Sequence, residues 1–362
     1  MLHKVIARRD LLKLGLVAGG AVLLSGCQKA VNMDFSATEL RSPDSTNSKM
    51  VELVRYATLA ANGHNTQPWK FKIMDTTIEI HADTSRHLAV VDPQDREQWI
   101  SLGCALENLV IAARATGFAS ELRYPDGKQN FITVNLLPDI AAISPLFDAI
   151  QVRQSTRSEY RQVQLSSDLI DQIHSASTEQ GVTLKFIEDI AETERVIDYL
   201  NAGNLTQYSD KAYIDELIAW LRFNKKEADA TRDGLYSKCS GNPSVPRFLG
   251  EMFVSGTKPQ SQAEADAKKL RSSSGSIIFA TENDSSEAWV RCGQAYERLS
   301  LQLTSLDLKS ALLNQPIEIP ELRAEFQTAM GLGENQPQLL MRYGVADAMP
   351  HSLRRPVDEV MI

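Results

Sequence analysis

One segment of the chain is rich in side-chain amides. It reads Ala61-Asn-Gly-His-Asn-Thr-Gln-Pro-Trp69, and it places Asn62, Asn65 and Gln67 between a predicted helix and a predicted strand. A side-chain amide offers both donors and an acceptor, so it can match a ring edge that carries carbonyl and N–H groups. His64 lies in the same loop, where a histidine is more often polar surface than a ligand.

Two further segments are rich in arginine. Arg153, Ser155 and Arg157 alternate along one of them, and the adjacent pair Arg354 and Arg355 begins the other, near the end of the chain. Two guanidinium groups and a serine hydroxyl can make bidentate, charge-assisted hydrogen bonds to a phosphate dianion. Either arginine pattern alone is also common on a solvated surface, so the interpretation depends on the three segments occurring together.

In order, the three segments resemble three signatures of the nitroreductase family. The amide segment is similar to the family's Pro-Ser-x-x-Asn-x-Gln-Pro-Trp loop, which lies along the isoalloxazine of FMN, although Ala61-Asn62 replaces Pro-Ser here. The segment 153–160 resembles the family's Arg-x-Ser-x-Arg/Lys phosphate segment, and 354–360 resembles its closing arginine segment. The resemblance implies FMN as cofactor, and the flavin would do the chemistry, so no catalytic acid or base is nominated. It implies these cofactor-binding residues: Asn62, Asn65, Gln67, Arg153, Ser155, Arg157, Arg354 and Arg355.

A repeated helical pattern indicates the architecture. Residues 99–109 match residues 289–299 without gaps, with identical Trp, Gly, Ala, Glu and Leu positions. Two unrelated amphipathic helices are the alternative, but identity in one register favours duplication. Alternating apolar runs predict strands in both halves. We therefore expect an α+β, nitroreductase-like fold, duplicated within one chain as a first half at 50–145 and a second half at 146–362. The predicted strands are 69–73, 77–82, 131–136, 184–187, 276–280 and 339–343.

The candidate segments are divided between the two halves. In the nitroreductase family, the phosphate segment of one subunit and the amide loop of the other hold each flavin of a homodimer. Here the first half has the loop without an Arg-x-Ser-x-Arg before it, whereas the second half has the phosphate segment but reads Ser-Thr-Glu-Gln-Gly-Val at 177–182. The resemblance thus predicts one complete site across the two halves of a monomeric pseudo-dimer, as in the Acg-like branch of the family.

Residues 223–275 have no counterpart in the first half. Loops this long in compact domains are usually lids or disordered segments, and the apolar residues in 223–254 favour a lid. If Tyr236, Phe248 or Met252 covers the isoalloxazine, the protein would sequester FMN with little turnover. Otherwise we expect an oxidoreductase that passes electrons from an unidentified donor to a nitroaromatic, quinone or similar small-molecule acceptor. A flavin fold used only for interaction is a third interpretation.

The first 26 residues are typical of a twin-arginine signal peptide. Arg8 and Arg9 precede the apolar run 14–24, which is too short to span a bilayer and ends in Leu-Ser-Gly-Cys27. The alternative is a buried N-terminal helix. The pattern predicts export, lipid attachment at Cys27, a flexible tether at 27–49, and a membrane-anchored domain that faces the periplasm or another extracytoplasmic space.

Composition excludes several other classes of function. The 362 residues carry a formal charge of −8, and the predicted leader has four basic residues and one acidic residue, so the chain without it would be near −11. An acidic chain without basic clusters is a poor candidate for binding nucleic acid. The remaining cysteines, Cys104, Cys239 and Cys292, have neither a zinc spacing nor an even number, so we predict no metal site and no disulfide framework.

Overall fold

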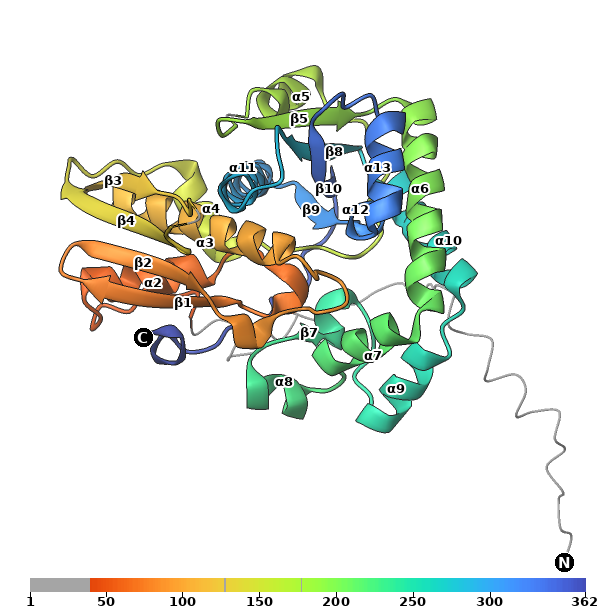
Figure 1. The fold of residues 1–362 in the computed structure, drawn as a ribbon, viewed down its shortest axis with the longest axis horizontal. Coiled ribbons are helices and arrows are strands. Elements are labelled where there is room, and N and C mark those ends of the chain that lie inside the picture. Colours follow the sequence, from red (N-terminus) through yellow and green to blue (C-terminus); the bar gives the residue numbers. More distant parts are fainter. Residues whose placement is uncertain (1–39, 127, 177) are drawn as a thin grey trace, which may run out of the picture. The chain divides into compact units, whose positions relative to one another are not determined.

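A computed structural model describes residues 40–126, 128–176 and 178–362 (Figure 1). The predicted signal peptide, Cys27 and most of the predicted tether lie outside the described residues. Within the described ranges, no helix has both the length and the apolar character needed to cross a bilayer.

The first half folds around a four-stranded antiparallel sheet. Its strands, in the order β1-β2-β4-β3, are β1 (Trp69–Met74), β2 (Thr77–Ala82), β4 (Phe131–Pro138) and β3 (Phe118–Arg123). Helices α2 (Lys49–Thr58) and α3 (Arg96–Ala115) belong to the same half. In β2, Ile78 and Ile80 are buried in the core while their neighbours are partly exposed. This alternation is expected of a sheet with only one covered face.

The second half contains a sheet that is covered on both faces. Its order is β5-β8-β10-β9, with β5 (Val182–Ile187), β8 (Gly275–Thr281), β10 (Gln336–Gly344) and β9 (Lys309–Leu312). In β8, Ile277 and Phe279 join the main core with α11 (Ser286–Ser305), whereas Ile278 and Ala280 join a second cluster. Burial on both faces explains why this strand is apolar at successive positions. The second cluster includes residues of α6 (Ile190–Ser209), α10 (Pro259–Arg271), α12 (Gln315–Glu318) and α13 (Pro320–Ala329).

The two halves share one topology, and they meet at helices α3 and α11 (Figure 1). A Cβ at Gly103 of α3 would lie 2.0 Å from the carbonyl oxygen of Val290, and a Cβ at Gly293 of α11 would lie 2.0 Å from that of Ile100. The contact is reciprocal, and these residues occupy equivalent positions in the repeat. The α+β prediction is confirmed, while an origin by duplication stays an interpretation of the sequence.

The six predicted strands are present, but four others were not predicted. Strands β3 and β9 contain few β-branched residues, so their composition carries little strand signal. The other two, β6 (Leu221–Arg222) and β7 (Leu235–Tyr236), form a two-residue parallel pair whose partners are separated by a helix. Such a pairing depends on tertiary contacts rather than on local pattern.

The predicted insertion at 223–275 divides into two parts. The first part holds α8 (Lys225–Thr231), which contacts β6, and α9 (Arg247–Ser255), which contacts the preceding helix α7 (Lys211–Trp220). The last part does not belong to a lid, because α10 packs on α6 and buries Ala267 and Leu270 in the second core cluster. Apolar positions on one face of the otherwise polar run hold α10 in the core, so this helix lies beyond the predicted lid at 223–254, which stays a prediction.

Both ends of the described chain pack onto the domain. Arg41 is buried and donates from Nη1 to the carbonyl oxygen of Gln151, 2.8 Å away, in the last turn of α4 (Pro145–Val152). The predicted tether boundary at residue 49 is therefore too late, because the chain already contacts the domain at Arg41. At the other end, Ile362 donates its N–H to Phe71 of β1 at 2.9 Å, so the C-terminal segment returns from the second half to the first sheet.

We expect Gly103→Ala to lower the free energy of unfolding by about 3 kcal/mol or more, because overpacking against a backbone carbonyl cannot be relieved by a rotamer change. Denaturant unfolding of the variant would measure this. Gly256→Ala is the control, since the nearest atom to its new Cβ is the Met252 oxygen at 3.1 Å. Equal stability of the two variants would contradict the proposed close packing of α3 on α11.

Candidate functional site

Two adjoining cavities lie where the halves meet. The large cavity, about 230 Å³, is walled by the amide loop together with residues of α3, α7, α11 and α12. The smaller arginine pocket, about 40 Å³, is walled by the phosphate-type segment, the residues around Arg354, and Arg41. The two cavities adjoin, because they share the wall residues Ala61, Asn62, Ser155, Arg157 and Leu235.

The arginine pocket concentrates positive charge. Its wall includes the four arginines Arg41, Arg153, Arg157 and Arg354. Among them, Arg153 is paired with a carboxylate, because its Nε lies 2.9 Å from Oε1 of buried Glu297. Burial, followed by the charge of Arg153, lowers the pKa of Arg354 to about 9, and burial also lowers the pKa of Arg41 and Arg157. Cations buried together in this way are stabilised by a bound anion.

Several donors in the pocket have no protein partner. Arg157 makes no hydrogen bond or ion pair with any described residue, and it lines both cavities. The buried Nε of Arg41 and Nδ1 of His351 also lack a partner in the described part of the chain. Burial, with the charges of Arg41, Arg153 and Arg354, lowers the pKa of His351 to about 3, so this ring is neutral near pH 7. Unpartnered donors beside Ser155 fit a ligand that is rich in anionic oxygen.

Arg354 has a different role because its donors are already used. Its Nε donates to the Thr58 carbonyl oxygen at 2.8 Å, its Nη2 to that of Ala60 at 3.0 Å, and its Nη1 to Oδ1 of Asn65 at 2.7 Å. The first two acceptors lie at the C-terminal end of α2, where a cation complements the helix dipole. Arg354 thus fixes Asn65 and the end of α2 while adding charge to the pocket.

The amide loop is held in a strained conformation. His64, Asn65 and Gln67 have φ values of 49°, 54° and 53°, in the left-handed region that costs energy for residues other than glycine. Asn62 stabilises it by accepting the Gln67 N–H at Oδ1, at 2.8 Å, and His64 lies in the wall of the large cavity. Burial, followed by the charge of Arg157, lowers the pKa of His64 to about 4. The loop therefore presents a neutral histidine beside an unpaired arginine.

Six of the eight predicted residues line the cavities, whereas Gln67 and Arg355 do not. Gln67 is fully buried behind the loop, and its Oε1 accepts the backbone N–H of Arg355 at 2.8 Å. The Arg355 guanidinium donates to the Gln67 carbonyl oxygen at 3.0 Å and faces Asp83. These contacts, with the bond from Gln67 Nε2 to the Arg232 carbonyl oxygen, support the loop from behind, and the predicted cofactor contacts of Gln67 and Arg355 stay predictions.

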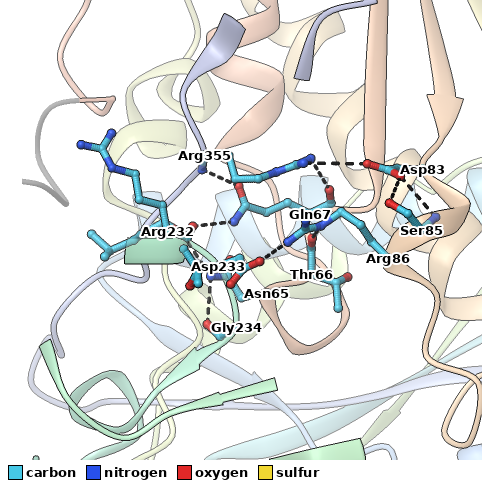
Figure 2. Close-up of polar contacts among 12 residues, drawn as sticks. Asn65, Thr66, Gln67, Asp83, Ser85, Arg86, Arg232, Asp233, Gly234 and Arg355 are labelled. Carbon is cyan, nitrogen blue, oxygen red and sulfur yellow. Dashed lines mark hydrogen bonds and ion pairs between the residues drawn. The ribbon is translucent and has the colours of Figure 1, made fainter. Parts of the chain in front are cut away.

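Figure 2 shows how the predicted lid is fastened to this loop. Gly234 and Asn65 exchange two hydrogen bonds of 3.0 Å, one from the Gly234 N–H to the Asn65 carbonyl and one from Asn65 Nδ2 to the Gly234 carbonyl. Asp233 pairs with Arg86 and, at 2.7 Å, with Arg222. Leu235, which follows Gly234, lines both cavities. We call residues 232–235 the lid clasp.

The residues expected to cover a flavin ring do not line either cavity. Phe248 and Met252 of α9 are 68% and 57% exposed, and Tyr236 is buried outside the cavity walls. Leu235 and, from α7, Tyr213 and Leu217 occupy the wall instead. The sequence could not indicate this, because α7 lies before the predicted insertion.

Two carboxylates that the sequence did not indicate line the large cavity but not the arginine pocket. Glu97 of α3 and Glu318 of α12 both line it. Burial, and then the charge of Glu97, raises the pKa of Glu318 to about 8, and burial raises that of Glu97. Of the missed polar residues, only Glu297 had a sequence signal, since it occupies a repeated position. Arg41 lay in the predicted tether, and Glu97, Glu318 and His351 had no recognisable motif.

The equivalent position in the other half is filled by side chains. Glu107, the repeat partner of Glu297, pairs with Arg298 at 2.7 Å, and Arg298 also pairs with Glu179 at 2.7 Å. Arg291 lies over the ring of Tyr124, 4.0 Å from its centroid. These cations have protein partners, so this region lacks the excess of free donors that marks the arginine pocket.

No family model matches the chain. It is 26% identical over 337 residues to "Putative NAD(P)H nitroreductase Rv3131" of Mycobacterium tuberculosis (strain ATCC 25618 / H37Rv), across 90% of this chain and 94% of that protein. It is 24% identical over 328 residues to "Putative NAD(P)H nitroreductase acg" of the same strain, across 87% and 96%. The chain is thus similar along most of its length to proteins that carry a nitroreductase name.

Solved structures of nitroreductases were also matched. The FMN-dependent nitroreductase NfnB from Mycobacterium smegmatis, in complex with NADPH, has a TM-score of 0.40 and 11% identity over 59% of this chain and 96% of that one. A nitroreductase with bound FMN from Desulfitobacterium hafniense DCB-2 has a TM-score of 0.37 and 13% identity over 60% and 97%.

We expect Asp233→Asn to loosen the lid clasp, because it removes the charge that pairs with Arg86 and Arg222. Amide hydrogen exchange at Gly234 should become about tenfold faster, equivalent to about 1.4 kcal/mol of local stability. Asp229→Asn is the control, since Asp229 pairs with Lys225 on the exposed side of α8. Unchanged exchange at Gly234 in Asp233→Asn would contradict the clasp.

Glu318→Gln should stabilise the protein at alkaline pH but not at acidic pH. The pKa of Glu318 is raised from 4.5 to about 8 on folding, so the folded state binds the extra proton and wild-type stability falls as pH rises across that interval. The variant lacks this loss, so its melting temperature should exceed that of wild type at pH 8.5 and equal it near pH 4. Exposed Glu321→Gln should show no such pH-dependent gap.

Proposed function

We propose that this chain is an FMN-dependent oxidoreductase of the nitroreductase type that reduces a nitro compound, a quinone or a similar small acceptor. The observation that supports it best is the unpaired Arg157 beside Ser155, at the junction between a pocket of buried arginines and a larger cavity. A flavin mononucleotide combines a phosphate dianion with a large polar-edged ring, and it needs two such adjoining spaces.

The wall residues suit the two ends of FMN. Arg157, Ser155, Arg153 and Arg41 would hold the phosphate, because they supply charge-assisted donors and one hydroxyl. Asn62 would face the ring in the large cavity. When bound, FMN accepts and passes on electrons, while buried positive charge near the ring stabilises its anionic reduced form. The protein contributes position, electrostatics and the exclusion of water by Leu235.

The predicted signal peptide bears on where the protein acts, and the names of the relatives bear on its electron donor. From the leader, we propose export by the twin-arginine route and lipid attachment at Cys27, which would place the protein at a membrane surface. We also propose that it acts as a monomer, because one chain supplies both the amide loop and the phosphate-type segment. The names of the Mycobacterium tuberculosis relatives specify NAD(P)H as their donor. Since NAD(P)H is scarce outside the cytoplasm, we propose a different, unassigned donor for this chain.

A second function, flavin sequestration with little turnover, is favoured by one observation. The lid clasp is hydrogen-bonded directly to the amide loop, and Leu235 lies in the wall of both cavities. If this segment stays closed, a bound flavin would be shielded from acceptors. Both proposals assign FMN as the cofactor, and they differ only in whether an acceptor can reach the bound flavin.

Ser155→Ala combined with Arg157→Gln should reduce FMN affinity by about two orders of magnitude or more, because each charge-assisted hydrogen bond contributes about 1.5–3 kcal/mol. Fluorescence titration of the apoprotein with FMN would measure this. Arg153 is the less suitable position, since its removal leaves buried Glu297 unpaired. Arg161→Gln is the control, because Arg161 is exposed and directly follows the same segment. Wild-type affinity of the double variant would overturn the phosphate assignment.

Absorption spectra of the purified domain would then separate the two functions. A yellow protein that is reduced by dithionite and reoxidised by a nitroaromatic or quinone is the result expected of the oxidoreductase. A yellow protein whose flavin resists dithionite, or is not reoxidised by acceptors, would support sequestration. A colourless protein that cannot be reconstituted with FMN would contradict both.

A further inference from the structure

The side of the large cavity away from the arginine pocket has the opposite chemistry. Glu97, Gln207, Gln315 and Glu318 line the large cavity but not the arginine pocket. We call these four residues the carboxylate end. They come from α3, α6 and α12, so tertiary structure alone brings them together.

Each of the two carboxylates has one oxygen to which no described residue donates a hydrogen bond. Oε1 of Glu97 accepts from Arg96 and Asn314, but its Oε2 makes no hydrogen bond in the described residues. Oε2 of Glu318 accepts from Gln207 Nε2, while its Oε1 likewise has no donor among the described residues. The Glu97 Oε2 atom lies 3.7 Å from the position of a Cβ at Gly63, so it sits next to the amide loop.

The two amides show the same deficit. The Oε1 atoms of Gln207 and Gln315 are buried and lack a hydrogen-bond partner within the described residues. Gln207 is only 6% exposed. A buried acceptor without a donor costs about 1–3 kcal/mol. The two buried amide oxygens are acceptors, and the free carboxylate oxygens are acceptors when ionised, so a hydrogen-bond donor would satisfy them.

The surrounding charge and the wall of the cavity favour a cation. Arg96 is the cation that acts on Glu318, and its guanidinium is already used by Glu97 and by the Gln338 carbonyl. Tyr213 adds an aromatic ring to the same cavity. Carboxylates together with an aromatic face are the usual surroundings of a bound ammonium or amidinium group.

We propose that the carboxylate end is the subsite for a positively charged, hydrogen-bond-donating group on the electron acceptor, such as an ammonium or amidinium. This assignment rests on the proposed function, in that it places the other end of that acceptor toward the cofactor. The preferred acceptor would then be an aromatic compound with a reducible group at one end and a cation at the other.

Binding of matched probes tests the subsite without any turnover. Calorimetry on the purified domain would compare 4-nitrobenzylamine with neutral 4-nitrobenzyl alcohol and anionic 4-nitrobenzoate. We expect the amine to bind at least about tenfold more tightly than the alcohol, with the benzoate weakest. Equal affinities, or preference for the benzoate, would overturn the proposal.

Two variants at Glu318 and one control variant test whether Glu318 causes the preference for the amine. Glu318→Gln keeps the shape and removes the charge, so the advantage of the amine over the alcohol should fall about tenfold while binding of the alcohol is retained. Glu318→Asp should keep part of that advantage, and exposed Glu321→Gln all of it. If Glu318→Gln keeps the full advantage of the amine, the subsite is not at Glu318.

Binding should also depend on pH. A cationic ligand favours ionised Glu318, so the affinity for 4-nitrobenzylamine should decrease as pH falls from 8 to 6, while that for the alcohol stays constant. A constant amine affinity would contradict the assignment. The charged and titratable groups that act on Glu318 or respond to it are Glu97, Asp92, Arg96, Tyr208 and Tyr213.

The same titrations separate this inference from the proposed function. If the amine binds preferentially but no flavin can be reconstituted, the subsite stands and the oxidoreductase fails. If flavin binds and all three nitro compounds are reduced with equal affinity, the oxidoreductase stands and the subsite fails.

Discussion

The close contact of α3 with α11 is the constraint on which the site depends. Two glycines allow the helix backbones to touch, and any Cβ at either position would meet a carbonyl oxygen 2.0 Å away. One turn beyond Gly293, Glu297 of α11 accepts the Ala61 N–H at 3.2 Å and pairs with Arg153. A single buried carboxylate thereby fixes the start of the amide loop from one half and the phosphate-type segment from the other.

The resulting site has an excess of positive charge in the arginine pocket and carboxylates in the adjoining cavity. Four buried or half-buried arginines share one pocket with one ion-paired carboxylate, and this arrangement is unfavourable without an anion. The opposite end of the adjoining cavity has carboxylates whose pKa values are raised by burial. Such a polarity gradient would orient a ligand that is anionic at one end, and it leaves the other end for a cationic partner.

The lid clasp, which has no counterpart in the first half, contributes Leu235 to the walls of both cavities. In the lid clasp, Gly234 makes one backbone and one side-chain hydrogen bond with Asn65, and Asp233 adds ion pairs with Arg86 and Arg222. The strained loop and its cover therefore stabilise each other. A change in either would alter both the shape of the cavity and its exposure to solvent, which connects cofactor retention with turnover.

The sequence by itself determined the local elements and the chemical character of the site. Period-two runs predicted β2 and β4, because alternation reflects burial on one face of a sheet, and short runs rich in apolar residues predicted β1, β5, β8 and β10. The arginine and amide segments carried their residue types in order. Tertiary structure decided which groups remain unpaired. It placed Gln67 and Arg355 behind the loop, and it brought Arg41, His351, Glu97 and Glu318 into the walls. Pairing depends on partners hundreds of residues apart, as with Arg354 and Thr58, and no local pattern records it.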